Sequence, residues 1–517
     1  MKKISIILLL AIFGFQFPAF NPLQAQSTEK PDAIYKLIRQ HYTVRRDGTT
    51  EYNYRKELTL LRNRAITAYA DKGETFIVYN PAFQSLTINE SYTIRKDGSR
   101  VQTPKRAFVE QLPSDCQSCR RFNGLVELAI VHTALEYDCT IVLDYTITSR
   151  TDILQQKIQL TQDCPVNKYE VIIDIPRDGK LYNHIDDNGC DIRQIADHHT
   201  LHIEATNLTQ TFSDRYLPPA EDIYPTIYFS NIESLSDRMR QMKDNLPAAQ
   251  LLILNDKDKI KKSGNRTEHE RNLMLVEDLR DYVVDNIRTN NISPVLQNYD
   301  CDEPTEVWTS ACGTPYEKAL TLAALFRQAG FYSYVSLGET ELTTTDDKKF
   351  HIVQGDMTTV NVVVDNEPLS LSAISKNPIR KVKQNRVSHR DIELTPTEAD
   401  NGYIVFSLPM EDNPTGIDAS YLTTKRTAPV LTTTCDNEYT YDIHLSTKAT
   451  LMNPVENAYD ITGLGSIKVS IKQNGDHIFV SKHIKIEKRL INTEDYSAFR
   501  QMMIDWSKNN TLYFKAK

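Results

Sequence analysis

Glycine is scarce in this sequence, at 17 of 517 residues, whereas globular proteins usually carry roughly 7%. With no glycine-rich loop in view, the phosphate-binding sites that depend on such loops are excluded. A basic excess is also missing, because 60 Lys and Arg face 68 Asp and Glu, a net charge of −8. Bulk charge therefore predicts no nucleic-acid binding. No motif indicates a nucleotide, haem or metal, so we expect no cofactor.

Aromatic and ordinary globular residues are what the chain does contain. It has 26 tyrosines, a hydrophobic fraction of 40% and a charged fraction of 25%. That composition excludes a disordered, collagenous or multi-pass membrane protein. A length of 517 residues predicts about three domains, since one core does not normally grow so large.

The N-terminus has the pattern of a secretory signal peptide. Lys2 and Lys3 precede an apolar run that ends near Phe20, and Ala25 supplies a small residue before a polar stretch. Two prolines interrupt the run, so it is not expected to span a membrane. We predict residues 1–25 as the signal peptide, whose removal takes the net charge from −8 to −10. No cysteine adjoins the cleavage point, which argues against a lipid anchor. We expect the mature chain to be exported, without a transmembrane segment.

Eight cysteines suit an oxidising compartment, and their pairing cannot be read from the sequence. Cys116 and Cys119 form a CxxC motif, but Pro113 to Asp115 predict a loop before it rather than the strand that precedes a redox helix. No second CxxC or suitably spaced histidine pair points to zinc. A local disulfide or two unrelated thiols is the expectation.

Residues 26–225 are predicted to form an antiparallel β-sandwich-like domain. Alternating β-branched and aromatic residues mark strands, and Asp-Gly and Asn-Gly pairs mark tight turns between them. His198, His199 and His202 gather on one of these strands, either as a metal site or as a solvated edge. The strands are expected at 51–60, 85–94, 124–133, 140–148 and 169–175.

Residues 235–378 are predicted to form a small α+β domain. Apolar residues recur at helical spacing from Leu275 to Ile287, and a second helix is expected at 315–329. Thr314 is its expected N-cap, with Glu317 completing a capping box, and Gly330 ends it. Strands are expected at 331–337, 360–365 and 369–373.

Residues 379–517 are predicted to form a second β-rich domain with a terminal helix. An Asn474-Gly475 turn joins two of its strands. The strands are expected at 403–408, 439–445, 467–472, 477–486 and 511–514, and the helix at 494–507.

The middle domain resembles the papain-like core of the transglutaminase-like superfamily. That family carries a nucleophilic cysteine at a helix start, with an alanine four, an arginine twelve and a glycine fifteen residues further on. Ala319, Arg327 and Gly330 keep this frame, which places the nucleophile at position 315. Pro315 occupies that position, and proline cannot act as a nucleophile.

The resemblance also implies a histidine and an aspartate on later strands. Setting the predicted hairpin at Asp365-Asn366 against the family pattern places the histidine position near 357–359 and the aspartate position near Ser372. All three catalytic positions are therefore expected to be vacated.

A rearranged triad is the alternative. Cys312 lies three residues before Pro315, with His351 and Asp365 downstream at spacings that suit the family. These three are the candidate catalytic residues. Cys312 can instead be a disulfide partner of nearby Cys301, or a buried thiol.

The flanking domains carry the resemblance further. Residues 55–58, 74–81 and 89–92 are similar to an uncharacterised β domain that precedes transglutaminase-like cores in Gram-negative envelope proteins. The closing helix, with Tyr496 and Phe499, resembles the module that ends the same architecture. The likeness implies a periplasmic or cell-surface protein.

Three functions remain open. The first is a non-catalytic protein that binds a peptide, glycan or protein partner in the envelope. The second is an active cysteine protease, amidase or transglutaminase that uses Cys312, His351 and Asp365. The third is a purely structural envelope scaffold. Substrate and oligomeric state are not encoded in any motif.

Overall fold

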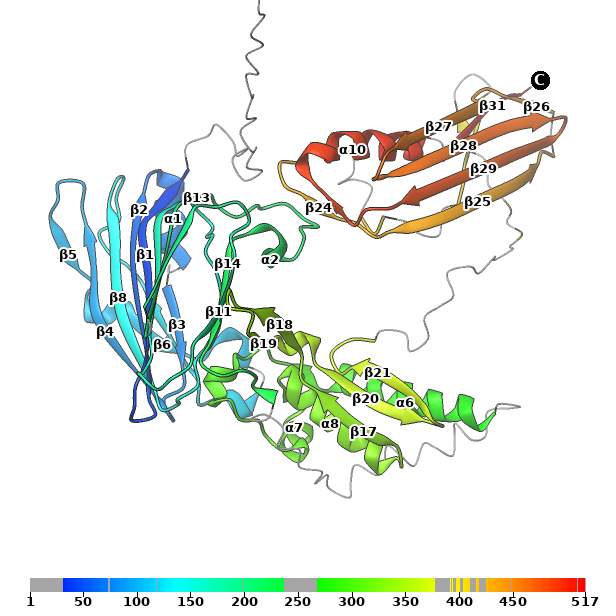
Figure 1. Ribbon diagram of the computed structural model, residues 1–517. Helices are drawn as coiled ribbons and strands as arrows, with labels where there is room; N and C mark the ends of the chain where they lie inside the picture. The colour runs from blue at the N-terminus through cyan, green and yellow to red at the C-terminus, as the bar shows by residue number, and fades with distance from the viewer. Residues whose placement is uncertain are drawn as a thin grey trace, which may run out of the picture.

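The computed structural model forms a strand-rich, multidomain chain (Figure 1). It describes residues 31–236 except 73, 74, 118 and 198, then 267–376, and from 391 onward 391, 393, 397–399, 403–409, 415–417, 425–446, 448–508 and 510–516. The predicted signal peptide, residues 1–25, lies outside these ranges. Within them, no helix has the length and apolar character needed to cross a bilayer.

The N-terminal body is built on an eight-stranded sheet with the order β12-β13-β10-β1-β2-β8-β4-β5. Six of its seven neighbouring strand pairs are antiparallel, as the hairpin turns predicted. The pair β1–β10 is parallel, so the expected wholly antiparallel arrangement is wrong at this point. A parallel pair needs a long crossover, which local turn signals cannot reveal. The strands are β1 (Ala33–Val44), β2 (Thr50–Leu60), β4 (Gln84–Ile94), β5 (Arg100–Gln102), β8 (Thr140–Ser149), β10 (Val166–Asp174), β12 (Ile192–Ala196) and β13 (Thr200–Leu208).

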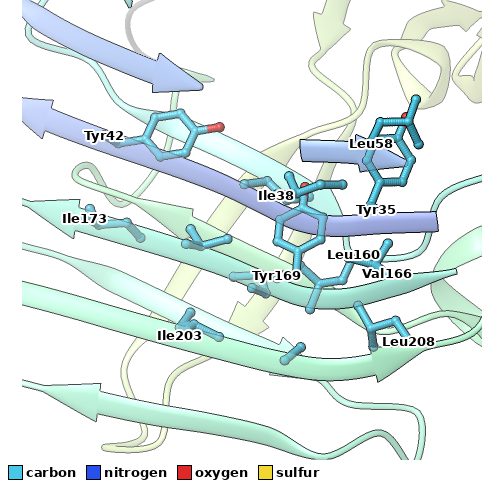
Figure 2. Close-up of a cluster of buried hydrophobic side chains, with 14 of the residues drawn as sticks. Tyr35, Ile38, Tyr42, Leu58, Leu160, Val166, Tyr169, Ile173, Ile203 and Leu208 are labelled. Carbon is cyan, nitrogen blue, oxygen red and sulfur yellow. The ribbon is translucent and has the colours of Figure 1, made fainter. Parts of the chain in front are cut away.

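Two three-stranded sheets cover one face of the large sheet. Ile141, Leu143, Tyr145 and Ile147 alternate along β8 and all point to that face. Figure 2 shows Tyr42 and other side chains of the resulting core. The layered, sandwich-like packing agrees with expectation. The small sheets are β3 (Thr75–Tyr79), β7 (Val126–Ile130) and β6 (Phe108–Gln111), and β11 (Tyr182–Asp186), β14 (Thr226–Ser230) and β9 (Gln155–Gln159); short helices are α1 (Asn63–Lys72), η2 (Lys105–Ala107), η3 (Ser114–Cys116), η4 (Arg120–Phe122) and α2 (Ala220–Ile223).

The central body is α+β, as predicted. Its helix α8 (Pro315–Gln328) is buried over Pro315 to Phe326, and it packs against α6 (Glu268–Asn286) and β20 (Thr359–Val364). The predicted end holds, because Gly330 adopts the left-handed φ of +92°. The remaining elements are β15 (Arg288–Thr289), η6 (Pro294–Gln297), α7 (Pro304–Ser310), β16 (Cys312–Gly313), β17 (Tyr332–Ser336), β18 (Glu339–Thr343), β19 (Lys349–Val353), η7 (Gly355–Met357) and β21 (Glu367–Ser372).

The C-terminal body has its own core. The long helix α10 (Thr493–Lys508) buries Phe499, Met503 and Trp506 against the sheet β25-β29-β28-β27 (Figure 1). The predicted strand 477–486 matches β29 (His477–Ile486) at both ends. Its other strands are β22 (Thr397–Ala399), β23 (Tyr403–Ser407), β24 (Val430–Leu431), β25 (Cys435–His444), β26 (Ala449–Leu451), β27 (Val455–Ile461), β28 (Gly465–Asn474), β30 (Leu490–Ile491) and β31 (Thr511–Ala516).

Candidate functional site

The start of α8 is built as the sequence predicts. Thr314 is the N-cap, Pro315 takes the first helical position, and both hydrogen bonds of the capping box with Glu317 are present. Proline is suited to this position because the first helical N–H has no intrahelical acceptor. This is the place at which the resemblance expects a nucleophile.

The carboxylate of Glu317 already occupies the positive end of the helix. Its side chain is 0% exposed, and Oε2 accepts a hydrogen bond of 2.8 Å from the N–H of Thr314. Oε1 accepts from the side chain of Gln297 at 3.0 Å and from the N–H of Asp302 at 3.0 Å. A helix N-terminus stabilises one nearby negative charge well. Here that charge belongs to Glu317, which leaves less of the effect for a neighbouring thiolate.

Arg121 of the N-terminal body neutralises this carboxylate. Its Nη2 lies 2.6 Å from Oε1 of Glu317, its Nε donates to Asp302 at 2.8 Å, and its Nη1 donates to the carbonyl of Cys312 at 2.8 Å. Burial works to lower the pKa of Arg121, but the charge of Glu317 and their hydrogen bond outweigh it and raise that pKa. The guanidinium thus ties the two bodies together at the helix start.

A disulfide between Cys119 and Cys312 lies beside this ion pair. It joins residues 193 positions apart, and its two sulfurs pack in a cluster with buried Cys116, Phe122 and Leu125. Of the alternatives left open, the local Cys116–Cys119 bond is wrong, and the two cysteines of the motif are not bonded to each other. Cys312 is in a disulfide, but with Cys119 instead of Cys301. Proximity in sequence was a poor guide because the partner of Cys312 comes from another body of the protein. Burial raises the pKa of the Cys116 thiol.

The positions at which the resemblance expects histidine and aspartate lie near the helix start. A Cβ added to Gly355 would come within 3.8 Å of the Pro315 ring, so η7 packs on the first turn of α8. The strand β20 follows η7 directly, and its Thr359 pairs with Ser372 of β21. The 357–359 segment and Ser372 thus sit at the same end of one hairpin, and neither supplies a histidine or an aspartate.

The three candidate catalytic residues have separate partners. Cys312 is in the disulfide, whereas His351 lies on β19 with its Nε2 3.6 Å from Glu341. Asp365 is at the tip of the β20–β21 hairpin, where it accepts from His269 at 3.0 Å and from Asn272. That tip is six residues from Thr359, roughly 20 Å along an extended strand. Asp365 is therefore at the opposite end of β20 from the start of α8.

The turn at Asp365-Asn366 was correctly predicted. Both residues have positive φ, +49° and +71°, as a two-residue hairpin loop requires. β19 ends at Val353, two residues after His351, and η7 follows it.

A hollow of about 300 Å³ opens beside the ion-pair cluster. It lies between the loop that follows β3, the segment after η4 and the segment after η6, so both bodies contribute to it. Its charged lining residues are Arg121, Asp300 and Asp302, and Asn80 and Phe83 also line it. A site of this size, with few charges, suits a side chain or a single sugar ring better than a large cofactor.

Two groups of metal-ligating side chains occur among the described residues, both away from α8. One, formed by Glu170, His202 and Glu204, includes part of the predicted histidine cluster; His198 lies outside the described residues. Arg39 and Lys168 already hold the carboxylate of Glu170, at 2.6 and 2.7 Å, so this group has its cations. The expected solvated edge is also wrong, because β13, which carries His202, pairs with β10 on one side and with β12 on the other. The second group is His444, Asp476 and His477.

Sequence reasoning missed Arg121 and the true partner of Cys312. The signal available was the CxxC motif, which marked Cys119 as notable without indicating what it faces. Arg120 and Arg121 followed it as an unremarkable basic pair. Only the docking of residues 113–125 onto the central body gives these side chains their partners.

Two family models match parts of the chain. Both are domains of unknown function for which a structure has been solved: DUF3857 matches residues 46–211 and DUF3858 matches residues 402–513. A search of curated proteins finds no match.

Solved structures supply the fold. A crystal structure from Parabacteroides distasonis, described as that of a candidate protease, overlays with a TM-score of 0.72 at 26% identity, covering 93% of this chain and 99% of that one. The periplasmic domain of TgpA from Pseudomonas aeruginosa gives a TM-score of 0.18 at 14% identity, over 44% of this chain and 77% of that one. An M1 zinc metallopeptidase from Deinococcus radiodurans gives 0.19 at 10%, over 48% and 53%. Those two overlays are too weak to carry an argument, whereas the first shares the fold nearly throughout.

Proposed function

We propose that this chain is an exported transglutaminase-like protein that has lost catalysis and acts as a binding or structural module in the cell envelope. Its partner is a peptide, a glycan or another protein. Residues 1–25 are the signal peptide, 26–225 the N-terminal β domain, 235–378 the transglutaminase-like core and 379–517 the C-terminal domain. The mature chain is periplasmic or associated with the cell surface.

One observation carries the loss of catalysis. Pro315 holds the expected nucleophile position, and the nearest upstream thiol, Cys312, is consumed in a disulfide with Cys119. Covalent acyl transfer needs a free thiolate next to a base. His351, the histidine of the alternative triad, lies on β19, and its charged neighbour is Glu341.

The binding role rests on the hollow beside Arg121. It is formed by two bodies that a disulfide and an ion pair hold together, so its shape is set before any partner arrives. A pre-formed site loses less entropy when it binds. Arg121 and Asp302 are already paired with each other, so Asp300 is the lining residue that offers its charge to a polar partner.

An active cysteine enzyme is the second candidate, favoured by the 26% identity to the candidate protease from Parabacteroides distasonis. In that case reduction frees Cys312, and His351 and Asp365 must move to meet it. The two proposals differ in what reduction does to activity.

The test is an activity assay on residues 26–517. The chain is incubated with casein and a fluorescent primary amine, with and without dithiothreitol, beside the Cys312→Ser variant. We expect neither peptide release nor amine incorporation in any sample. Turnover that appears in the reduced wild type and vanishes in Cys312→Ser overturns the proposal.

Binding is tested by photo-crosslinking in envelope extract. A benzoyl-phenylalanine at position 83 reports on the hollow, and the same group at position 76 is the matched control, because Phe76 is exposed on β3 outside the hollow lining. We expect adducts at 83 and none at 76. Absence of adducts at both positions favours the structural scaffold.

A further inference from the structure

Two histidines and two aspartates meet at the tip of the C-terminal body. His444 ends β25 and His477 begins β29, and the two residues face each other as a cross-strand pair. The Asn474-Gly475 turn places Asp476 next to them. Their rings lie 4.9 Å apart between centroids, at an angle of 76°.

The carboxylate of Asp476 lies between the two imidazoles. Its Oδ2 is 2.9 Å from Nε2 of His444, and its Oδ1 is 4.0 Å from Nε2 of His477. One ligand atom from each of these three side chains falls within 4.8 Å of the others. Zinc-bound nitrogen and oxygen atoms lie about 2.0–2.2 Å from the ion. Small rotations of exposed side chains bring all three atoms to that range.

Asp442 provides a second, independent indication. Its Oδ1 lies 3.0 Å from Nδ1 of His477, on the far side of the ring from Asp476. A proton on Nδ1 leaves Nε2 as a lone pair aimed at the cluster. Histidines that bind metals almost always donate their other N–H to a carboxylate or carbonyl in this way.

We propose that His444, His477 and Asp476 form a Zn²⁺ site, with Asp442 orienting His477. Imidazole and carboxylate are ligands that zinc accepts, and three protein ligands leave a fourth position for water or a group from another molecule. The side chains are 43% to 63% exposed, so the ion can enter from solvent without rearrangement of the sheet.

A neighbouring pair on the same two strands supplies the control. His483 of β29 lies 2.6 Å from Asp436 of β25, and among the described residues this pair is part of no group of three metal-ligating side chains. A lone His–Asp pair offers two ligands only. Removal of His483 therefore matches the chemistry of the test variants without touching the proposed site.

The experiment is calorimetric titration of residues 26–517 with zinc chloride, and with magnesium chloride as a hard-cation control. We expect zinc binding in the wild type and in His483→Ala, loss of that binding event in His444→Ala and in His477→Ala, and no heat with magnesium. Asp442→Ala should weaken zinc binding by about 10- to 100-fold, the usual effect of losing such a hydrogen-bond partner.

Unchanged zinc affinity and stoichiometry in both His444→Ala and His477→Ala would overturn the proposal. So would equal loss in His483→Ala, which would point to general binding by surface histidines. Thermal unfolding of each variant without metal checks that a loss of zinc binding does not come from a loss of the fold. Because all these side chains are exposed, each variant should melt as the wild type does.

Discussion

At the scale of single residues, Glu317 and Arg121 show how the start of α8 is held. The carboxylate is 0% exposed and the arginine side chain 9%, and they meet at 2.6 Å. The capping box that contains Glu317 could be predicted, because its sequence pattern is local. The Arg121 contact could not, since it spans 196 residues and depends on how two bodies dock.

Glu317→Ala should therefore destabilise the protein strongly. It removes the partner of a buried arginine and a helix cap together, and breaking a buried pair costs about 3–5 kcal/mol. Urea denaturation of the oxidised chain measures the loss. The control is Glu51→Ala, which breaks an exposed 2.6 Å pair with Arg45 and should cost no more than about 1 kcal/mol. Equal losses of unfolding free energy in the two variants would show that the Glu317–Arg121 pair stabilises the protein no more than an exposed ion pair does.

Lys318 is a buried cation with a pH signature. Its Nζ donates to the carbonyl of Ile287 at 2.6 Å, and burial lowers its pKa to about 8 from the usual 10.5. Between those values the unfolded chain keeps a proton that the folded chain has lost. Unfolding then takes up a proton and becomes less favourable as pH rises, so Lys318 contributes increasing stability above pH 8.

Lys318→Met isolates this contribution. Buried thiols such as Cys116 and Cys139 have raised pKa values and act in the opposite direction, so the wild-type slope alone is not diagnostic. We expect the stability of the variant relative to wild type to fall between pH 7.5 and 9.5 in urea titrations. An exposed control, Lys349→Met, should show no such trend. A pH-independent difference for Lys318→Met would contradict the assignment.

At the scale of elements, short-range signals predicted more than long-range pairings. The hairpin at Asp365-Asn366 and the helix from Pro315 follow from turn and capping residues that lie within a few positions. The parallel pairing of β1 with β10 and the Cys119–Cys312 bond join segments more than 100 residues apart. No local pattern specifies which distant segments pair. For the disulfide, the eight cysteines alone allow 105 pairings.

The disulfide should be detectable and stabilising. Peptide mapping under non-reducing conditions is expected to recover Cys119 linked to Cys312; recovery of Cys116–Cys119 or Cys301–Cys312 would contradict the structure. Because the bond closes a very long loop, Cys312→Ser should cost about 2–5 kcal/mol in urea denaturation. Cys190→Ser, which removes a half-buried thiol outside any disulfide, should cost far less.

At the scale of the whole molecule, the three bodies are joined unequally. The N-terminal and central bodies share a disulfide, the Arg121–Glu317 pair and mixed apolar clusters, in one of which Tyr182 and Tyr228 pack on Phe350. The C-terminal body encloses its own core and is contacted by Tyr216, whose carbonyl accepts from the N–H of Leu431 at 2.9 Å. Composition and local pattern led to the expectation of three domains, but these joints could not be predicted from them.

Separate expression should reveal this difference. We expect residues 391–517 to unfold cooperatively on their own, because their buried side chains pack on one another. Residues 235–378 alone should lack a cooperative transition, since β19 loses the side chains that cover Phe350. Circular dichroism during urea titration makes the comparison. Cooperative unfolding of the isolated central segment would mean that the joints contribute little.

The most direct test of the central claim is the reactivity of Cys312 toward iodoacetamide at pH 6, followed by mass spectrometry. A catalytic thiolate of depressed pKa reacts quickly at this pH, and an ordinary thiol does not. We predict no labelling of Cys312 in the oxidised chain and, after reduction, labelling no faster than that of glutathione. Rapid alkylation of reduced Cys312 at pH 6, many times faster than glutathione, would contradict the loss of catalysis.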